Sequence, residues 1–133
     1  MNTLVIGIII AIGLLTSLVL VVIYTEEPKQ IIVIKDYGNL VNVIIARGSG
    51  NQDNPDNYLP KEIKVVLGIN NTVQWINQDD TPESVVSDTG LFDSGIIVPD
   101  GRWIYTFEKT GEYGYHGVPH PWMKGKVIVE SLG

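Results

Sequence analysis

The side chains best suited to metal or redox chemistry lie near the carboxyl end of this 133-residue chain. His116 and His120, the two histidines, stand four positions apart, and Met123 follows three residues later. The chain contains no cysteine. This excludes disulfides, thiolate catalysis, zinc fingers and thiolate-held clusters.

The sequence offers little for nucleophilic catalysis. Ser84 and Ser87 lie close to Glu83, but no nucleophile elbow or other triad motif surrounds these serines. We therefore expect a protein that is not an enzyme.

Segment 47–60 has the composition of a calcium loop without its spacing. Its oxygen-bearing side chains include Asp53, Asn54, Asp56 and Asn57. The glycine and the distal glutamate of an EF-hand are missing at the required offsets, so the segment predicts a solvated surface loop.

The charges of the chain are unevenly placed. Nine basic and fifteen acidic residues give a net charge of −6, and all of them lie at or after Glu26. No run of Lys or Arg is present, so the chain lacks the basic footprint that nucleic-acid binding requires.

The first 25 residues form an apolar leader. Residues 4–23 read LVIGIIIAIGLLTSLVLVVI, and about twenty such residues in a helix span a bilayer core. A cleaved signal peptide would need a basic start and a shorter apolar stretch. The sequence predicts a transmembrane anchor at 1–25, a linker at 26–30 and a β-domain at 31–133.

The remaining chain predicts short strands divided by turns. β-Branched or alternating runs separated by Gly, Asn, Asp and Pro are typical of an antiparallel sandwich or barrel. The expected strands are 31–34, 40–46, 61–67, 72–77, 96–98, 102–108, 112–116 and 124–131.

Four pieces of sequence follow one another in a specific order. They are YLP at 58–60, TVQWINQD at 72–79, FDSG at 92–95 and GEYGYHGVPHPWMKGKV at 111–127. This set resembles the cupredoxins, the small blue copper proteins, and the last piece is most similar to the amicyanin and plastocyanin members. The resemblance implies an all-β, antiparallel Greek-key sandwich, here preceded by one transmembrane helix.

The same resemblance implies where copper ligands would stand. A blue copper site uses two His, one Cys and a long axial Met. His120 and Met123 match the second His and the Met, whereas Glu83 stands at the first His position and Gly117 at the Cys position. We therefore expect no type 1 site and no bound cofactor.

A rebuilt copper site is the alternative, because Glu83, His120 and Met123 would converge there by family geometry. A carboxylate, an imidazole and a thioether are a poor set for zinc and a weak mixed set for Cu(II). His116 is expected to face away, since neighbouring strand residues point to opposite faces. Without metal, a hydrogen bond from Glu83 to His120 or a bridging water would satisfy the carboxylate.

The loop between the two matching ligands is a candidate docking surface. It consists of Val118, Pro119, His120, Pro121 and Trp122, and Trp122 is the expected anchor of a partner contact. In the family the matching loop contacts redox partners.

The leading hypothesis is an anchored, degenerate cupredoxin that serves as an accessory subunit of a membrane complex. By family association, the host is a copper-dependent oxygenase or a respiratory oxidase. The β-domain is then extracytoplasmic. The alternative is electron transfer or copper handling through the rebuilt site.

Overall fold

The structure is a computed structural model, and it describes residues 5–8, 21–24 and 39–133. The chain divides into two compact units, Met1–Asp36 and Tyr37–Gly133, each of which is described by itself.

The described part of the first unit is a pair of short antiparallel strands, β1 (Val5–Ile8) and β2 (Val21–Tyr24). Most of the transmembrane helix expected over residues 4–23 falls outside the described residues, so that helix stays a prediction. Within the described residues, no helix has the length and apolar character needed to cross a membrane.

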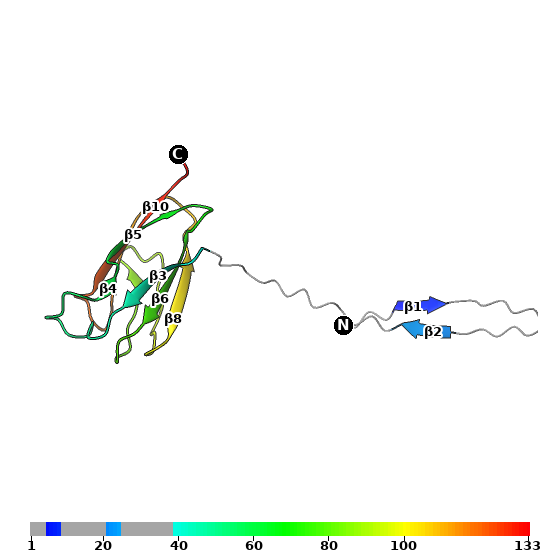
Figure 1. The fold of residues 1–133 in the computed structure, drawn as a ribbon, viewed down its shortest axis with the longest axis horizontal. Coiled ribbons are helices and arrows are strands. Elements are labelled where there is room, and N and C mark those ends of the chain that lie inside the picture. Colours follow the sequence, from blue (N-terminus) through cyan, green and yellow to red (C-terminus); the bar gives the residue numbers. More distant parts are fainter. Residues whose placement is uncertain (1–4, 9–20, 25–38) are drawn as a thin grey trace, which may run out of the picture. The chain divides into compact units, whose positions relative to one another are not determined.

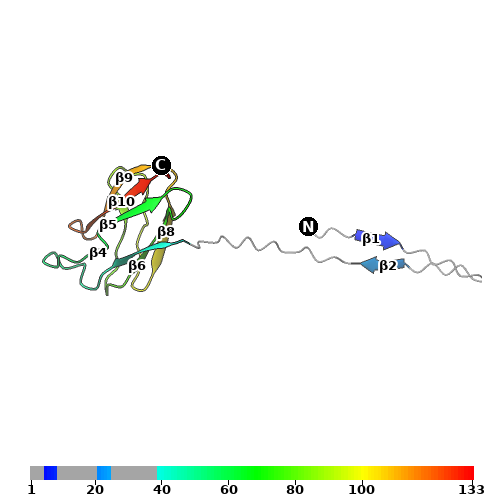
Figure 2. The ribbon, with the colours of Figure 1, turned by 45° about the horizontal axis from the view of Figure 1, so that its top comes forward.

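The second unit is a sandwich of two four-stranded sheets, whose layers are visible in Figures 1 and 2. One sheet has the order β5-β10-β9-β7 and the other the order β4-β3-β6-β8. The strand bounds are β3 Val41–Ile45, β4 Tyr58–Leu59, β5 Glu62–Val66, β6 Thr72–Asn77, β7 Val86–Ser87, β8 Arg102–Thr106, β9 Gly111–His116 and β10 Lys124–Glu130. The predicted all-β sandwich is confirmed for this unit.

The expectation of a purely antiparallel sandwich is wrong. Strand β10 runs parallel to β5, and β3 runs parallel to β6, while the other pairs in these sheets are antiparallel. The chain crosses between the sheets as it passes from β3 to β5 and again from β5 to β6. The neighbour of a strand is therefore often not its hairpin partner, and parallel pairing becomes available.

Two short strands and one bridge differ from the predicted elements. Strands β4 and β7 lie in segments expected to be loops, and each has only two residues. The strand predicted at 96–98 is reduced to one bridge, in which Ile97 exchanges two backbone hydrogen bonds with Glu83 at 2.8 and 3.0 Å. The strand predicted at 31–34 lies outside the described residues.

Aromatic rings fill the space between the two sheets. Trp75 of β6 is fully buried, and its ring centroid lies 5.3 Å from that of Trp103 and 5.5 Å from that of Tyr115. Tyr115 packs in turn against Tyr58, with centroids 4.8 Å apart in an edge-to-face arrangement. Such pairs add roughly 0.5–1.5 kcal/mol each beyond the burial of their area.

The ring of Tyr115 requires a glycine beside it on β10. Tyr115 pairs with Gly125 across the sheet, and a Cβ added at Gly125 would lie 2.3 Å from Cζ of the tyrosine. The ring cannot swing away, because it is held between Tyr58 and Trp75 and is only 1% exposed.

We expect Gly125→Ala to lower the free energy of unfolding by about 1–3 kcal/mol, the usual cost of overpacking a core. Urea unfolding followed by tryptophan fluorescence measures this change. The control is Gly133→Ala, since a Cβ at Gly133 would meet nothing within 4 Å. Equal stability of the two variants would show that the tyrosine ring can move aside.

Candidate functional site

A buried carboxylate and a histidine meet where three loops come together at one end of the sandwich. Glu83, in the segment after β6, is fully buried, and its Oε2 lies 2.8 Å from Nδ1 of His120. His120 belongs to the connection between β9 and β10, and 19% of its side chain is exposed. The hydrogen bond expected between Glu83 and His120 is present.

The other oxygen of Glu83 lies against a hydroxyl group with two acidic neighbours. Thr81 Oγ1 is 2.9 Å from Glu83 Oε1 and 3.1 Å from Asp79 Oδ2. A hydroxyl carries one proton, so Thr81 cannot donate to both carboxylates at once. The hydroxyl of Thr81 therefore lies between the two acidic side chains and donates to one of them at a time.

The surroundings of Glu83 raise its pKa. Burial raises this pKa, and the hydrogen bonds with His120 and Thr81 oppose that rise without cancelling it. Hydrogen bonds to both oxygens of Glu83 reduce the cost of burying the group.

Asp79 ties the loop after β3 to this end of the sandwich. Its carboxylate accepts hydrogen bonds from the backbone N–H groups of Gly48, Gly50 and Asp80 at 2.8–3.0 Å, in addition to the contact with Thr81. Burial raises the pKa of Asp79, but these donors outweigh it and lower the pKa to about 2. An ionised Asp79 thus holds Gly50 close to the ring of His120, where a Cβ on Gly50 would lie 3.2 Å from Cε1.

Gly117 leaves no room for a larger residue at the position matched to the copper-binding cysteine. A Cβ at Gly117 would lie 2.9 Å from the carbonyl oxygen of His120 and 3.5 Å from the hydroxyl of Tyr58. The loop is closed by two backbone hydrogen bonds, from Gly117 N to Met123 O and from Met123 N to His120 O. The backbone of the loop therefore fills the space beside Gly117.

Tyr58 belongs to the YLP piece at 58–60, to which the sequence analysis gave no role in the site. Its hydroxyl donates a 2.6 Å hydrogen bond to the carbonyl oxygen of Ser84, next to Glu83. Burial raises the pKa of this phenol far above its usual value, and Tyr115 and Glu83 add to the rise. Tyr58 therefore stays protonated and fixes the segment that carries Glu83.

The candidate docking loop, residues 118–122, is partly exposed. Val118 is 61% exposed, Pro119 and Pro121 are exposed, and Met123 is fully buried below them. Trp122, the expected anchor, is half-buried. Its Nε1 donates to Ser49 O at 3.0 Å, and its ring lies 5.1 Å from that of His120. Much of this tryptophan is thus used to hold the two loops together.

His116 lies away from this group, as expected from strand alternation. Its Nδ1 is 2.6 Å from Oδ1 of Asp88, and both side chains are partly exposed. It pairs across the sheet with Val86 and Lys124. His116 therefore does not contribute to the site around Glu83.

The residues present do not provide the ligands of a type 1 copper centre. Gly117 supplies no thiolate, and one ring nitrogen of His120, Nδ1, is engaged with Glu83. In the described part of the chain, no three His, Cys, Asp or Glu side chains are grouped so that they could hold a metal ion.

The fold and this site place the chain in a known family. The profile of the cupredoxin-like domain matches residues 14–129, and the chain belongs to this family. Amicyanin from Paracoccus versutus is 36% identical over 78 residues, which is 55% of this chain and 58% of that protein. Amicyanin from Paracoccus denitrificans is 35% identical over the same shares. The match thus spans less than two thirds of either relative.

Solved structures agree with this assignment. A purple cupredoxin from Nitrosopumilus maritimus superposes with a TM-score of 0.62 and 30% identity, covering 68% of this chain and 99% of that one. A Cu(I) form of an amicyanin variant gives 0.58 and 31%, covering 69% and 83%.

We expect Asp79→Asn to lower the free energy of unfolding at pH 7 by about 1–2 kcal/mol, allowing for solvent screening near the surface. The pKa of about 2 for Asp79 in the folded protein lies below 3.8, the usual pKa of an aspartate side chain. The stabilisation is therefore present above pH 3.8 and is lost as the pH falls towards 2. Urea unfolding at pH 7 and at steps down to pH 2 measures it.

Asp80→Asn is the matched control for this measurement. Asp80 is 70% exposed and pairs only with the exposed Arg47, so its loss should change stability by well under 1 kcal/mol. The interpretation is wrong if the Asp79 variant keeps the same acid dependence as the wild-type chain.

Proposed function

We propose that this chain is an accessory subunit of a membrane protein complex, built on a cupredoxin-like domain that does not use type 1 copper. The observation that carries the proposal is the hydrogen bond between Glu83 and His120. Two positions that the family resemblance assigns to copper ligands contact each other here.

The surroundings support a site that is complete without metal. Both oxygens of Glu83 have partners, and Gly117 is closed against the backbone of His120. A buried carboxyl group with satisfied hydrogen bonds stabilises one loop arrangement. The site can thus serve to shape the docking loop.

The surface above the site supports the docking part of the proposal. Val118 donates its backbone N–H to Ser84 Oγ. Glu83, the residue before Ser84, donates its backbone N–H to the carbonyl oxygen of Ile97. Ile96 and Val98, which flank Ile97, are 63% and 58% exposed. Val118, Ile96 and Val98 are thus exposed apolar side chains on segments joined to the site, in a chain of net charge −6, and exposed apolar groups of this kind mark interaction surfaces.

The apolar leader supports the membrane part. A stretch of twenty residues, apolar except for Thr16 and Ser17, has the length of a single-pass anchor, with the β-domain outside the cytoplasm as in anchored relatives. A copper-dependent oxygenase or a respiratory oxidase is the proposed host complex.

Copper retention tests the proposal. The full chain, purified in mild detergent, is incubated with excess Cu(II) and desalted, and the retained copper is measured. We expect far less than one copper ion per chain and no intense visible absorption. The chain has no cysteine to supply a thiolate, and Nδ1 of His120 is hydrogen-bonded to Glu83.

Glu83→Ala and His120→Ala serve as paired controls and should retain as little copper as the wild-type chain. Stoichiometric copper that is lost in both variants would instead establish copper handling through Glu83, His120 and Met123.

Association with the host complex gives a second prediction. Val118→Asp should reduce the amount of co-purifying membrane protein, because it places a charge in the apolar surface. The control is Ile69→Asp, which alters a 46% exposed residue in the turn between β5 and β6. Equal recovery with both variants would move the interface away from residues 118–122.

A further inference from the structure

A separate aromatic pocket lies at the other end of β9 from the Glu83 site. Strand β9 leads from Gly111 to His116, and Gly117 follows at the Glu83 end. The pocket is formed at the beginning of this strand by Tyr113, by the end of β8 and by the turn around Gly90. Its volume is about 570 Å³, within the range of small-molecule sites.

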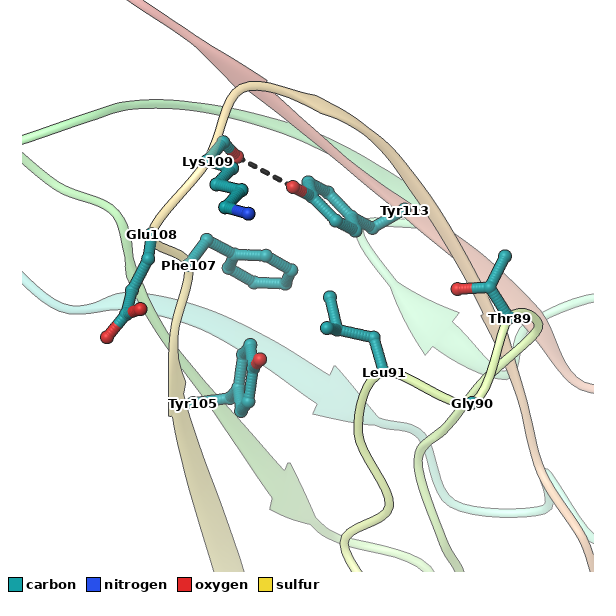
Figure 3. Close-up of a pocket in the computed structure, with 8 residues that line it drawn as sticks. All are labelled: Thr89, Gly90, Leu91, Tyr105, Phe107, Glu108, Lys109 and Tyr113. Atoms are coloured by element: carbon teal, nitrogen blue, oxygen red, sulfur yellow. Dashed lines mark hydrogen bonds between the residues drawn. The ribbon is translucent and has the colours of Figure 1, made fainter.

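Three rings and one aliphatic side chain make the apolar wall of the pocket, as Figure 3 shows. Phe107 is 1% exposed and forms the floor, and its ring is nearly perpendicular to that of Tyr105, with centroids 5.0 Å apart. Tyr113 lies on the other side of Phe107 at 4.9 Å. Leu91 stands opposite and is 52% exposed, which leaves its methyl groups without a cover.

The partly exposed ring of Tyr105 favours a flat ring as the ligand. A ring placed against Tyr105 can adopt the stacked or the edge-to-face arrangement, the two that aromatic pairs prefer. The wall is also fixed in position, because the Tyr113 hydroxyl donates a 2.7 Å hydrogen bond to Lys109 O.

One charge is directed at this pocket. Figure 3 shows the ammonium group of Lys109 over the rings and the carboxylate of Glu108 turned away from them. Lys109 has no ion-pair partner among residues 39–133, whereas Lys64 and Lys126 on the neighbouring sheet are paired. An unpaired cation beside an apolar pocket is complementary to a ligand with an apolar body and a negative group.

We infer that this pocket binds a small aromatic carboxylate, with its ring between Tyr105 and Leu91 and its carboxylate at Lys109. The site is independent of the docking loop and of the Glu83–His120 pair.

Three probes of similar reach test the inference on the full chain in mild detergent. They are 3-phenylpropionate, its uncharged analogue 3-phenylpropanamide, and butanoate, which has the charge without the ring. The amide NMR shifts of Leu91, Phe107 and Tyr113 and the methyl shifts of Leu91 report binding. We expect saturation by 3-phenylpropionate with a Kd on the order of millimolar, and weaker binding of the other two.

Lys109→Gln should weaken 3-phenylpropionate about threefold to fivefold, the contribution of an exposed ion pair, and should leave 3-phenylpropanamide unchanged. Lys124→Gln, at the start of β10, is the matched control and should change neither probe. Equal binding of the acid and the amide, or no saturable shift at these three residues, would overturn the inference. Equal binding of butanoate would overturn the role of the rings.

Discussion

The arrangement of one end of this domain depends on satisfying a single buried carboxyl group. Glu83 has no exposed surface, so each of its oxygens must find a partner inside the protein. His120 satisfies one oxygen and Thr81 the other. Because His120 belongs to the connection between β9 and β10, the requirement of Glu83 also fixes the loop that carries Val118 to Trp122.

The same requirement extends to a third loop. Thr81 contacts Asp79 as well as Glu83, and Asp79 accepts the backbone N–H groups of Gly48 and Gly50. Trp122 closes the connection by donating to Ser49. Hydrogen bonds thus join three loops that are distant in sequence. Each of these hydrogen bonds involves Glu83, His120 or Asp79, or a residue at most two positions from one of them. Networks of this kind are stabilising only when every member is satisfied.

The sequence predicts the long elements of the fold well and the short ones poorly. Strand β6 has the predicted bounds, since its β-branched and aromatic residues stand between turn-forming residues on both sides. Strands β4 and β7 have two residues each, which is too short for any period to be recognised. The parallel pairs could not be predicted from local patterns, because pairing depends on where distant strands are placed by the sheet crossings.

In the Glu83 site, the sequence was informative for hydrogen bonds between two side chains. The cost of burying Glu83, combined with the family resemblance, was sufficient to anticipate its hydrogen bond to His120. The contacts of Asp79 with Gly48 and Gly50, and of Trp122 with Ser49, use backbone groups, which have no signature in residue type. Asp79 did belong to the motif at residues 72–79, and this was the available signal for its role.

The closed backbone at Gly117 has a consequence for how such a domain can change over time. A cysteine introduced there would place its Cβ 2.9 Å from the carbonyl oxygen of His120, a contact that forces the loop to shift. That loop is held by the pair of His120 with Glu83, so the thiolate position and the first histidine position restrain each other. Neither change alone restores a ligand set, and each alone disturbs a packed interior. A single substitution towards the ligand set of a blue copper protein therefore requires the backbone between Gly117 and Met123 to rearrange.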